Sequence, residues 1–292
     1  MSTVVPALPS EPTQPARSDF VVRRLLRRPT AAVAAFVVAL LVAVTLGAPL
    51  FAPYSPTTLD FDQLFGPPSR EHLFGTDELG RDLLTRILYG GRTSMLLGFA
   101  ATAVAMGVGV VWGFSAALRE GWLGEILMRV ADTLMAMPAI LLGLVLVAAF
   151  GNSTLSMIVI LGILFAPATA RIARSTLLAE LRSEYYLAAV SVGASGRRIV
   201  ARELLPNALP VLVSRASLVL AEVIFVEASL SFIGLGIQPP DTSWGTLLQQ
   251  GYANLYSSYT YSIFPGIVIL VAVLALNTLG DNIQKVLDPS RA

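Results

Sequence analysis

The sequence lacks cysteine altogether and has one histidine, His72, and one lysine, Lys285, among its 292 residues. The absence of thiols excludes a disulfide framework, thiolate metal sites and cysteine nucleophiles. A phosphate-binding G-x-x-x-x-G-K-[ST] loop needs a lysine directly after a glycine, whereas Lys285 follows "GDNIQ", so the chain cannot hydrolyse ATP by that route. No G-x-S-x-G nucleophile elbow occurs either. We therefore expect a chain that is not an enzyme and holds no cofactor of its own.

Charged residues make up only 13% of the chain, against about a quarter in ordinary soluble domains. Hydrophobic residues make up 55%, the mean hydropathy is +0.71, and the net charge is +1, with no basic face that would suit nucleic acid. The many glycines and prolines do not indicate disorder, because both are tolerated in membrane helices. These values predict an all-α polytopic membrane protein.

Six hydrophobic segments approach or exceed the length of about 20 residues that a helix needs to cross a bilayer. They are residues 31–52, 94–118, 133–150, 155–172, 209–234 and 263–283. The first is longer than the apolar core of a secretory signal, roughly 7–15 residues, so we interpret it as an uncleaved helix behind a polar, arginine-rich tail. The third and fourth are short, and only "GNST" separates them, which predicts a tight helical hairpin.

The distribution of arginine and lysine predicts the orientation of these helices. With the N-terminus inside, 15 basic residues fall on the cytoplasmic side and 4 on the outer side, and the reverse orientation would invert this ratio. The positive-inside rule therefore favours a cytoplasmic tail at 1–30, a transmembrane domain at 31–284 and a cytoplasmic C-terminus at 285–292. Two longer segments, 53–93 and 237–262, then lie outside the cytoplasm.

The outer segment 53–93 contains six acidic residues and His72. A metal site there is weakly supported, because His72 has no second histidine or cysteine to join it. The alternative, which we favour, is a histidine at the surface of an extracytoplasmic loop.

Three charged residues lie inside the predicted fifth span: Arg215, Glu222 and Glu227. Such charges are costly in a bilayer, at about 2.5–3.5 kcal/mol each. Arg215 and Glu222 share a helical face two turns apart, whereas Glu222 and Glu227 are separated by roughly 140° around the axis. An ion relay is one interpretation, but the other spans hold no carboxylate apart from Asp132 and Asp281 at their cytoplasmic ends. Polar contacts inside the bundle or with a partner are the favoured alternative.

The stretch "SEYYLAAVSVGASGRRIVARELLPNALP", residues 183–210, separates two hydrophobic spans on the predicted cytoplasmic side. Its first part predicts a helix that ends at Gly193, since glycine adopts left-handed backbone angles at little cost. Its second part, "GRRIVARELL", predicts a short helix that Pro206 ends. The first helix carries apolar residues where no lipid surrounds them: Tyr185, Tyr186, Val190 and Val192. They indicate either a helix that fits a groove on another protein or an elbow packed on the chain's own helices.

Several stretches resemble one family. Ala188, Ala189, Gly193, Leu205 and Pro206 match the "EAA…G…LP" coupling loop of permease subunits in binding-protein-dependent ABC importers. The extension "GAS-x-x-R-I…R-x-x-LPN" of this stretch resembles the dipeptide, oligopeptide and nickel branch of the family. Four further stretches resemble the C-type permease of that branch. They are "HLFGTDELGRDLLTRILYGGRTSMLLG", "RVADTLMAMPAILL", "EASLSFIGLGIQPPDTSWG" and "NTLGDNIQKVLDP".

Two positions depart from the family's pattern. Leu187 stands where the coupling loop usually has glutamate, and Glu203 stands where the branch often has histidine. Glu184, about one turn before Leu187, is a candidate for the missing acid. We therefore carry over no salt bridge between this loop and an ATPase.

The resemblance implies a type I ABC importer permease fold with six transmembrane helices in the cytoplasmic (inner) membrane of a bacterium. It implies a second, homologous permease, two ATPase subunits or domains that bind ATP and magnesium, and an extracytoplasmic substrate-binding protein. The ATPases would move the loop 183–208, whose candidate coupling residues are Ala188, Ala189, Gly193, Ser195, Gly196 and Pro206. The binding protein would dock on the outer segments, where the candidates are Gly75, Asp77, Gly80, Arg81, Asp241 and Trp244. An alternative is that these outer loops only brace the bundle.

Short peptides are the expected substrate, because they are the most frequent substrate of the branch that the sequence resembles. An importer of nickel or another small solute is an alternative, although no methionine or histidine cluster in the predicted spans favours a metal. An ion-coupled secondary transporter that uses Glu222 or Glu227 is another, and it would work without ATP. A scaffold that binds a partner without substrate flux is the third.

Overall fold

The computed structural model describes residues 25, 27–119, 121–238 and 241–287. Over these residues the chain is helical, with irregular connections, one isolated β-bridge between Thr76 and Asp82, and no strand. The predicted all-α membrane fold is confirmed. Five of the described helices are long and apolar enough to cross a membrane, and a bent pair of helices adds a sixth crossing if it is counted as one span. Most of the predicted tail at 1–30 and part of the predicted C-terminus at 285–292 lie outside the described residues.

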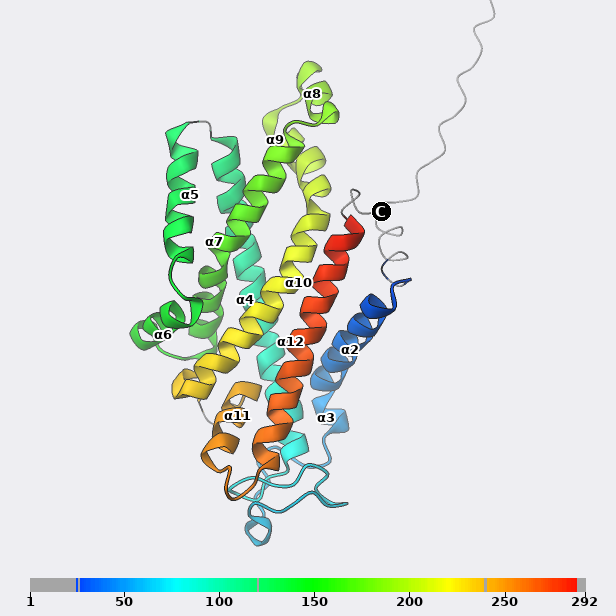
Figure 1. Cartoon of the computed structure of the whole chain (residues 1–292), viewed down its shortest axis with the longest axis vertical. Helices are drawn as coiled ribbons and strands as arrows, with labels where there is room; N and C mark the ends of the chain where they lie inside the picture. The colour runs from blue at the N-terminus through cyan, green and yellow to red at the C-terminus, as the bar shows by residue number, and fades with distance from the viewer. Residues whose placement is uncertain (1–24, 26, 120, 239–240, 288–292) are drawn as a thin grey trace, which may run out of the picture.

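Five long helices form the bundle in Figure 1: α2 (Pro29–Leu46), α4 (Leu83–Leu118), α7 (Thr154–Glu180), α10 (Leu205–Leu230) and α12 (Thr260–Leu287). The shorter elements are α3 (Ala48–Phe51), η1 (Phe61–Gln63), α5 (Trp122–Met135), α6 (Ala139–Phe150), α8 (Glu184–Ser191), α9 (Gly196–Ile199), η2 (Val200–Leu204), η3 (Ser231–Leu235) and α11 (Trp244–Ala253).

The third predicted span, residues 133–150, is not one continuous helix, so that prediction is wrong, whereas the tight turn predicted after it is present between α6 and α7. α5 ends at Met135, α6 begins at Ala139, and the two helices are bent by 91°. Pro138 lies at this break. The helix does not continue through it, because proline disfavours helical angles at the preceding residue and has no N–H to donate. α6 has only 12 residues, which are too few to cross a bilayer alone, and it precedes α7 in the chain.

Two predicted spans continue beyond their expected ends. α4 begins at Leu83 rather than near residue 94, because the Asp82 carboxylate accepts a hydrogen bond from the Thr85 N–H at 2.8 Å and caps the helix. α7 continues to Glu180 rather than ending near residue 172. At 1.5 Å per residue α4 is about 54 Å long, so it extends well past a hydrocarbon core of about 30 Å.

The prediction that Pro206 ends a short helix is also wrong. α9, η2 and α10 follow one another without a break, and Pro206 lies in the first turn of α10. η2 is a π-helical turn in which the Leu205 N–H donates to the Val200 carbonyl, five residues back. The wider turn accommodates a proline that cannot donate to the carbonyl four residues before it. The predicted cytoplasmic loop 183–208 is therefore continuous with a long helix of the bundle.

Glycines bring α4 and α7 into close contact at the centre of the bundle. A Cβ atom at Gly113 would lie 2.2 Å from the Ala170 carbonyl oxygen, and one at Gly109 would lie 2.8 Å from that of Ala166. Small residues of this kind let the backbones of membrane helices approach each other. α10 packs beside this pair and also contacts α12.

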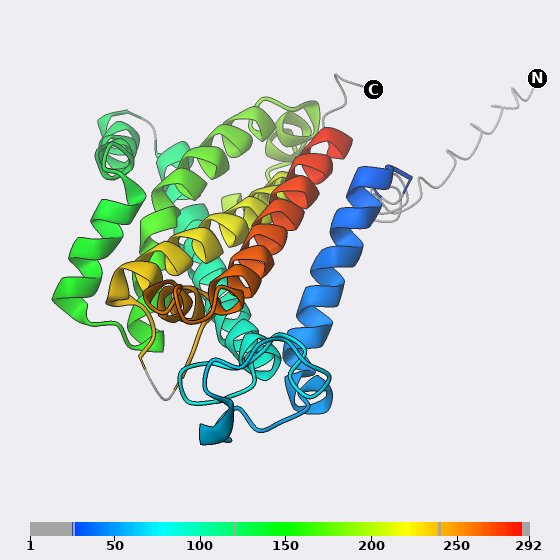
Figure 2. The same cartoon turned by 60° about the horizontal axis from the view of Figure 1, so that its bottom comes forward.

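The two ends of the bundle are formed by different elements. α8, the start of α2 and the end of α12 lie at one end, which is the predicted cytoplasmic end (Figure 1). The irregular segment between α3 and α4 lies at the opposite end, together with the first turn of α12, and Figure 2 brings this end forward. The candidate sites for the ATPases and for the binding protein are therefore at opposite ends.

Candidate functional site

α8 projects from the bundle between α7 and α9, as the sequence predicts (Figure 1). One of its faces packs on the chain itself, since Tyr185, Tyr186 and Ala189 contact a cluster of buried residues. That cluster consists of Phe114, Ala173, Leu177, Ile199, Leu204, Ala208 and Leu212. For these two tyrosines the packing favours the elbow, one of the two alternatives that the sequence left open. On this side the loop is an elbow fixed to its own helices.

A hydrogen bond strengthens the attachment of the elbow. The Tyr185 hydroxyl donates to the carboxylate of Glu180 at the end of α7. Burial raises the pKa of Tyr185, and the Glu180 carboxylate raises the pKa further. The hydroxyl therefore stays protonated and remains a donor at neutral pH.

The other face of α8 is apolar and uncovered. Leu187, Val190 and Val192 are 57%, 48% and 83% exposed, and Ala188 is exposed beside them. Large apolar side chains that gather on an exposed surface mark an interaction site more often than scattered single ones do. A short helix with one anchored face and one free apolar face suits insertion into a groove of another protein.

The two glycines of this loop differ in their backbone requirements. Gly193 has φ +75°, in the left-handed region, and its N–H donates to the Val190 carbonyl at 2.9 Å. This conformation ends α8 and turns the chain towards α9, as the sequence predicts. A Cβ atom at Gly196 would meet nothing within 4 Å, and this glycine does not have a positive φ. Ser195, between them, is exposed and carries no conformational demand.

The acid at the start of α8 lies where the sequence suggests. Glu184 is exposed in the first turn of the helix, three residues before Leu187 and therefore on a neighbouring part of the same surface. Glu203 lies in the π-turn η2 and is partly exposed. The proposal that Glu184 replaces the acid missing at Leu187 stays a prediction.

At the opposite end, Asp77 is fully buried and binds several donors. Its carboxylate accepts from the N–H groups of Leu79 and Arg81 at 2.8 and 2.9 Å, from the Arg81 Nε at 2.6 Å and from the Arg86 guanidinium. Arg86 also donates to the Tyr261 hydroxyl at 2.9 Å and to the Gln250 side-chain oxygen at 3.0 Å. This network ties the outer segment to α4, α11 and α12, and it favours the bracing interpretation for Asp77.

Two glycines beside Asp77 are required by the backbone. Gly75 and Gly80 have φ +85° and +73°, and a Cβ atom at Gly80 would lie 1.7 Å from the Asp60 carbonyl oxygen. Both positions serve the shape of the loop. Arg81, bound to Asp77 and Glu78, is partly exposed, so it and the free edge of this loop remain predicted docking positions.

His72 is buried in this region, so the expectation of a surface histidine is wrong. Its Nδ1 lies 3.0 Å from Asp82 Oδ1, and its ring lies 4.9 Å from the ring of Tyr54. In the described part of the chain, no group of three or more histidine, cysteine, aspartate or glutamate side chains could hold a metal ion. The histidine supports the cap of α4.

Trp244 is also buried, at 1% exposure. Its indole N–H donates to the Ile87 carbonyl at 3.0 Å, and its backbone N–H donates to the Ser94 hydroxyl at 3.1 Å. In this conformation Trp244 cannot touch a docked protein. Asp241, three residues earlier, is exposed and can.

The stretch "EASLSFIGLGIQPPDTSWG" forms a joint between α10 and α11. The Glu227 carboxylate accepts hydrogen bonds from the hydroxyls of Ser231 and Ser243 at 2.7 and 2.8 Å. Ser243 also caps α11 by accepting from the Thr246 N–H, and a Cβ atom at Gly245 would lie 2.7 Å from the Cα of Ala228. The roles of Ser231 and Ser243 could not be predicted, because isolated serines carry no local signal of a long-range partner.

Arg215 and Glu222, which their spacing places on one helical face, form an ion pair. Two hydrogen bonds of 3.0 Å join the guanidinium to the carboxylate, in the bidentate geometry that is the strongest for this pair. Glu227 has different partners, so the two carboxylates do not form a relay with each other. The side chain of Glu222 is 39% exposed, whereas that of Arg215 is 8% exposed.

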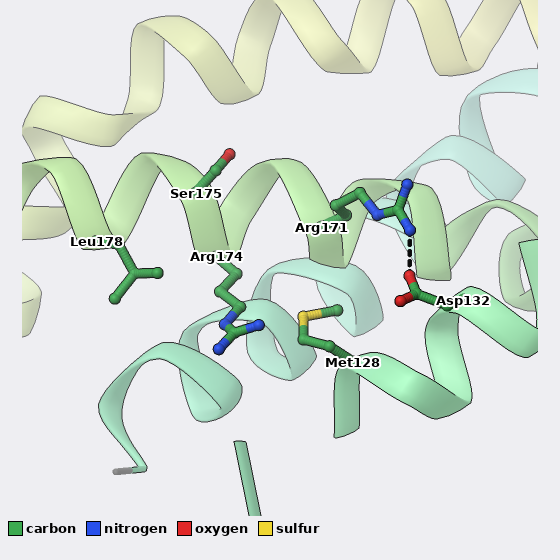
Figure 3. A pocket seen from close by; sticks show the side chains of 6 residues that line it. All are labelled: Met128, Asp132, Arg171, Arg174, Ser175 and Leu178. Carbon is green, nitrogen blue, oxygen red and sulfur yellow. Dashed lines mark hydrogen bonds and ion pairs between the residues drawn. The ribbon is translucent and has the colours of Figure 1, made fainter. Parts of the chain in front are cut away.

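Asp132, expected at the cytoplasmic end of a span, pairs with Arg171 across α5 and α7 (Figure 3). The pair borders a pocket of about 220 Å³, into which the side chain of Arg174 also points, beside Met128. Both members of the ion pair are about half exposed, so the pair contributes little stability. Asp281, the other expected acid, is exposed near the end of α12.

Sequence comparisons identify the family of this chain. The family model of binding-protein-dependent transport system inner membrane components matches residues 109–292, and that of the N-terminal TM domain of oligopeptide transport permease C matches residues 19–68. A protein of Brucella suis named a peptide transport system permease is 39% identical over 267 residues, which cover 91% of this chain and 90% of the relative. The glutathione transport system permease protein GsiD of Pectobacterium atrosepticum is 38% identical over 268 residues, with 91% and 89% covered.

Solved structures share the fold. Two inward-facing structures of the MetNI methionine ABC transporter contain chains that match with TM-scores of 0.55 and 0.58. The matches cover 70% of this chain and 96% and 97% of those chains, at 23% and 21% identity, which shows the fold alone. The family model of binding-protein-dependent transport systems matches more than half of this chain. The chain therefore belongs to the inner membrane components of these systems and is a non-catalytic permease subunit of an ABC importer.

Proposed function

We propose that this permease carries short peptides across the cytoplasmic membrane of a bacterium. Two observations on relatives support peptides as substrates: one relative is named for peptide transport, and another for glutathione, itself a short peptide. The match to the N-terminal domain of an oligopeptide transport permease supports the same substrate class.

The full assembly that we propose has a second, homologous permease, two ATPase subunits or domains, and a substrate-binding protein outside the membrane. The N- and C-termini lie in the cytoplasm, in keeping with the excess of arginine on that side. The ATPases bind the loop 183–208, and the binding protein docks at the opposite end of the bundle.

The uncovered apolar face of α8 is the observation that carries the coupling role. ATP-driven closure of the ATPases would displace α8. Because α8 packs on α7 and on the continuous helix α9–η2–α10, the displacement would reach two spans directly. The bundle then switches between two states that a ligand bound elsewhere biases.

A single cysteine tests this proposal, because the chain has none of its own. Ser195→Cys places a thiol on the exposed turn after α8, and a short cross-linker is applied in native membranes that hold the whole transporter. We expect cross-linking to an ATPase subunit with a yield that changes when ATP is added. Labelling of this thiol from outside the cell would contradict the orientation, and a cytoplasmic thiol without an ATPase partner would contradict the coupling role.

A further inference from the structure

A cavity of about 590 Å³ lies at the end of the bundle opposite α8. Its walls come from the segment before α4, from the first turns of α4, and from residues before and within α11. Tyr89, Arg92 and Thr93 of α4 line it together with Asp241 and Gln250. The volume falls within the range of roughly 300–1,000 Å³ that is typical of sites for small molecules.

Three of the charged side chains that line this cavity are already paired: Glu78, Arg81 and Arg86. Both arginines bind the fully buried Asp77, and Arg81 also binds one oxygen of Glu78. These acids neutralise the two arginines, which are held by the network that braces the outer segment. A ligand would have to break these bonds to bind either arginine.

Two further charges on the wall are not neutralised. Arg92 and Asp241 are both exposed, and neither makes a hydrogen bond or ion pair with another described residue. They have opposite signs and line the same cavity, yet they do not pair with each other. Tyr89, one turn before Arg92, and the amide of Gln250 add neutral polar groups beside them.

We propose that this cavity is an entry site for a zwitterionic peptide, whose carboxylate binds Arg92 and whose ammonium group binds Asp241. The planar guanidinium matches a carboxylate through two parallel hydrogen bonds, which makes Arg92 the main determinant of binding. The inference rests on the proposed import of peptides and names the chemical groups that the permease recognises. A side chain of the docked binding protein is the less favoured occupant, because the cavity is walled by three segments of the chain rather than flat.

Equilibrium binding of labelled L-alanyl-L-alanine to the membrane complex of permeases and ATPases in nanodiscs, with the separate binding protein left out, tests the site. We expect saturable binding that weakens about tenfold in Arg92→Gln, recovers in part in Arg92→Lys, and is unchanged in Arg70→Gln, an exposed outer arginine that does not line the cavity. The C-terminal amide of the dipeptide should bind about tenfold more weakly than the free acid to the wild type. It should show no further loss in Arg92→Gln, because the interacting carboxylate is already absent.

Three results would overturn the inference. They are an absence of saturable dipeptide binding to the wild type, an equal loss for acid and amide in Arg92→Gln, and a loss of affinity for the binding protein in that variant. ATP-dependent uptake of the same dipeptide is measured in parallel. If the wild type takes up the dipeptide while binding is insensitive to Arg92, the site is wrong and the proposed function stands. If the wild type takes up no peptide, the proposed function itself fails.

Discussion

The two ends of the bundle differ in how their side chains are covered. At the predicted outer end, the buried charges of Asp77 and Arg86 bind each other and the polar groups of α11 and α12. At the elbow, Leu187 and Val190 of α8, and Val192 just after this helix, remain exposed. The first region has its partners within the chain, whereas the second leaves apolar side chains uncovered. This difference favours a fixed frame at the outer end and supports the proposal that the elbow is a surface for a partner.

The largest effect is expected from breaking the frame at Asp77. Asp77→Asn removes the charge that two arginines share, and leaving a buried charge unpaired costs about 3–5 kcal/mol. The free energy of unfolding, measured by denaturing detergent titration of the purified permease, should fall by that amount. Asp62→Asn, an exposed acid in the same segment, is the matched control and should change it by about 0.5 kcal/mol or less. Equal losses in the two variants would contradict the bracing role.

Removing Glu222 should have the next largest effect. Glu222→Gln leaves the mostly buried Arg215 without its charged partner, and hydrogen bonds to charged groups contribute about 1.5–3 kcal/mol each. In a double-mutant cycle with Arg215→Gln, we expect a coupling energy of at least about 1 kcal/mol. Loss of transport with no loss of stability would instead favour ion coupling through Glu222 and would contradict a structural pair.

At the elbow we expect a loss of binding without a loss of stability. Val192→Ser removes exposed apolar surface, so the affinity for the ATPase should fall about tenfold, or about 1.4 kcal/mol, with unfolding unchanged. Leu255→Ser, which alters an exposed leucine at the outer end, should leave that affinity unchanged. Titration of labelled ATPase against the permease in nanodiscs measures both. An effect of Val192→Ser on unfolding would mean that its side chain belongs to the chain's own core.

The smallest difference should separate the two glycines of the loop. Gly193→Ala forces a side chain into the left-handed region and should cost about 1 kcal/mol, whereas Gly196→Ala meets open space and should cost a few tenths or nothing. Hydrogen exchange of the α8 amides should rise in the first variant and stay constant in the second. If both variants behave alike, the backbone conformation of Gly193 is not what ends α8.

Local patterns were sufficient for several features of this molecule. The hydrophobic segments predicted the membrane helices, the spacing of Arg215 and Glu222 placed them on one helical face, and Gly193 predicted the end of α8. Other features needed long-range contacts. The charged, turn-rich stretch around Asp77 is typical of a surface loop, and nothing local indicated that Asp77 and Trp244 are buried. The uninterrupted apolar composition on both sides of Pro138 likewise concealed a bend of 91°.

From the sequence alone it follows that the chain is a helical membrane protein without a phosphate-binding loop for ATP, and that the polar break at residues 183–208 contains a short helix. These properties follow from composition and from periodicities of a few residues, which act locally. The packing of the helices was needed to show which face of α8 is covered, which charges at the outer end cancel, and which two remain free in the cavity. The reason is that burial and pairing depend on residues such as Arg86, Gln250 and Tyr261, which lie far apart in the chain and meet only when the helices pack.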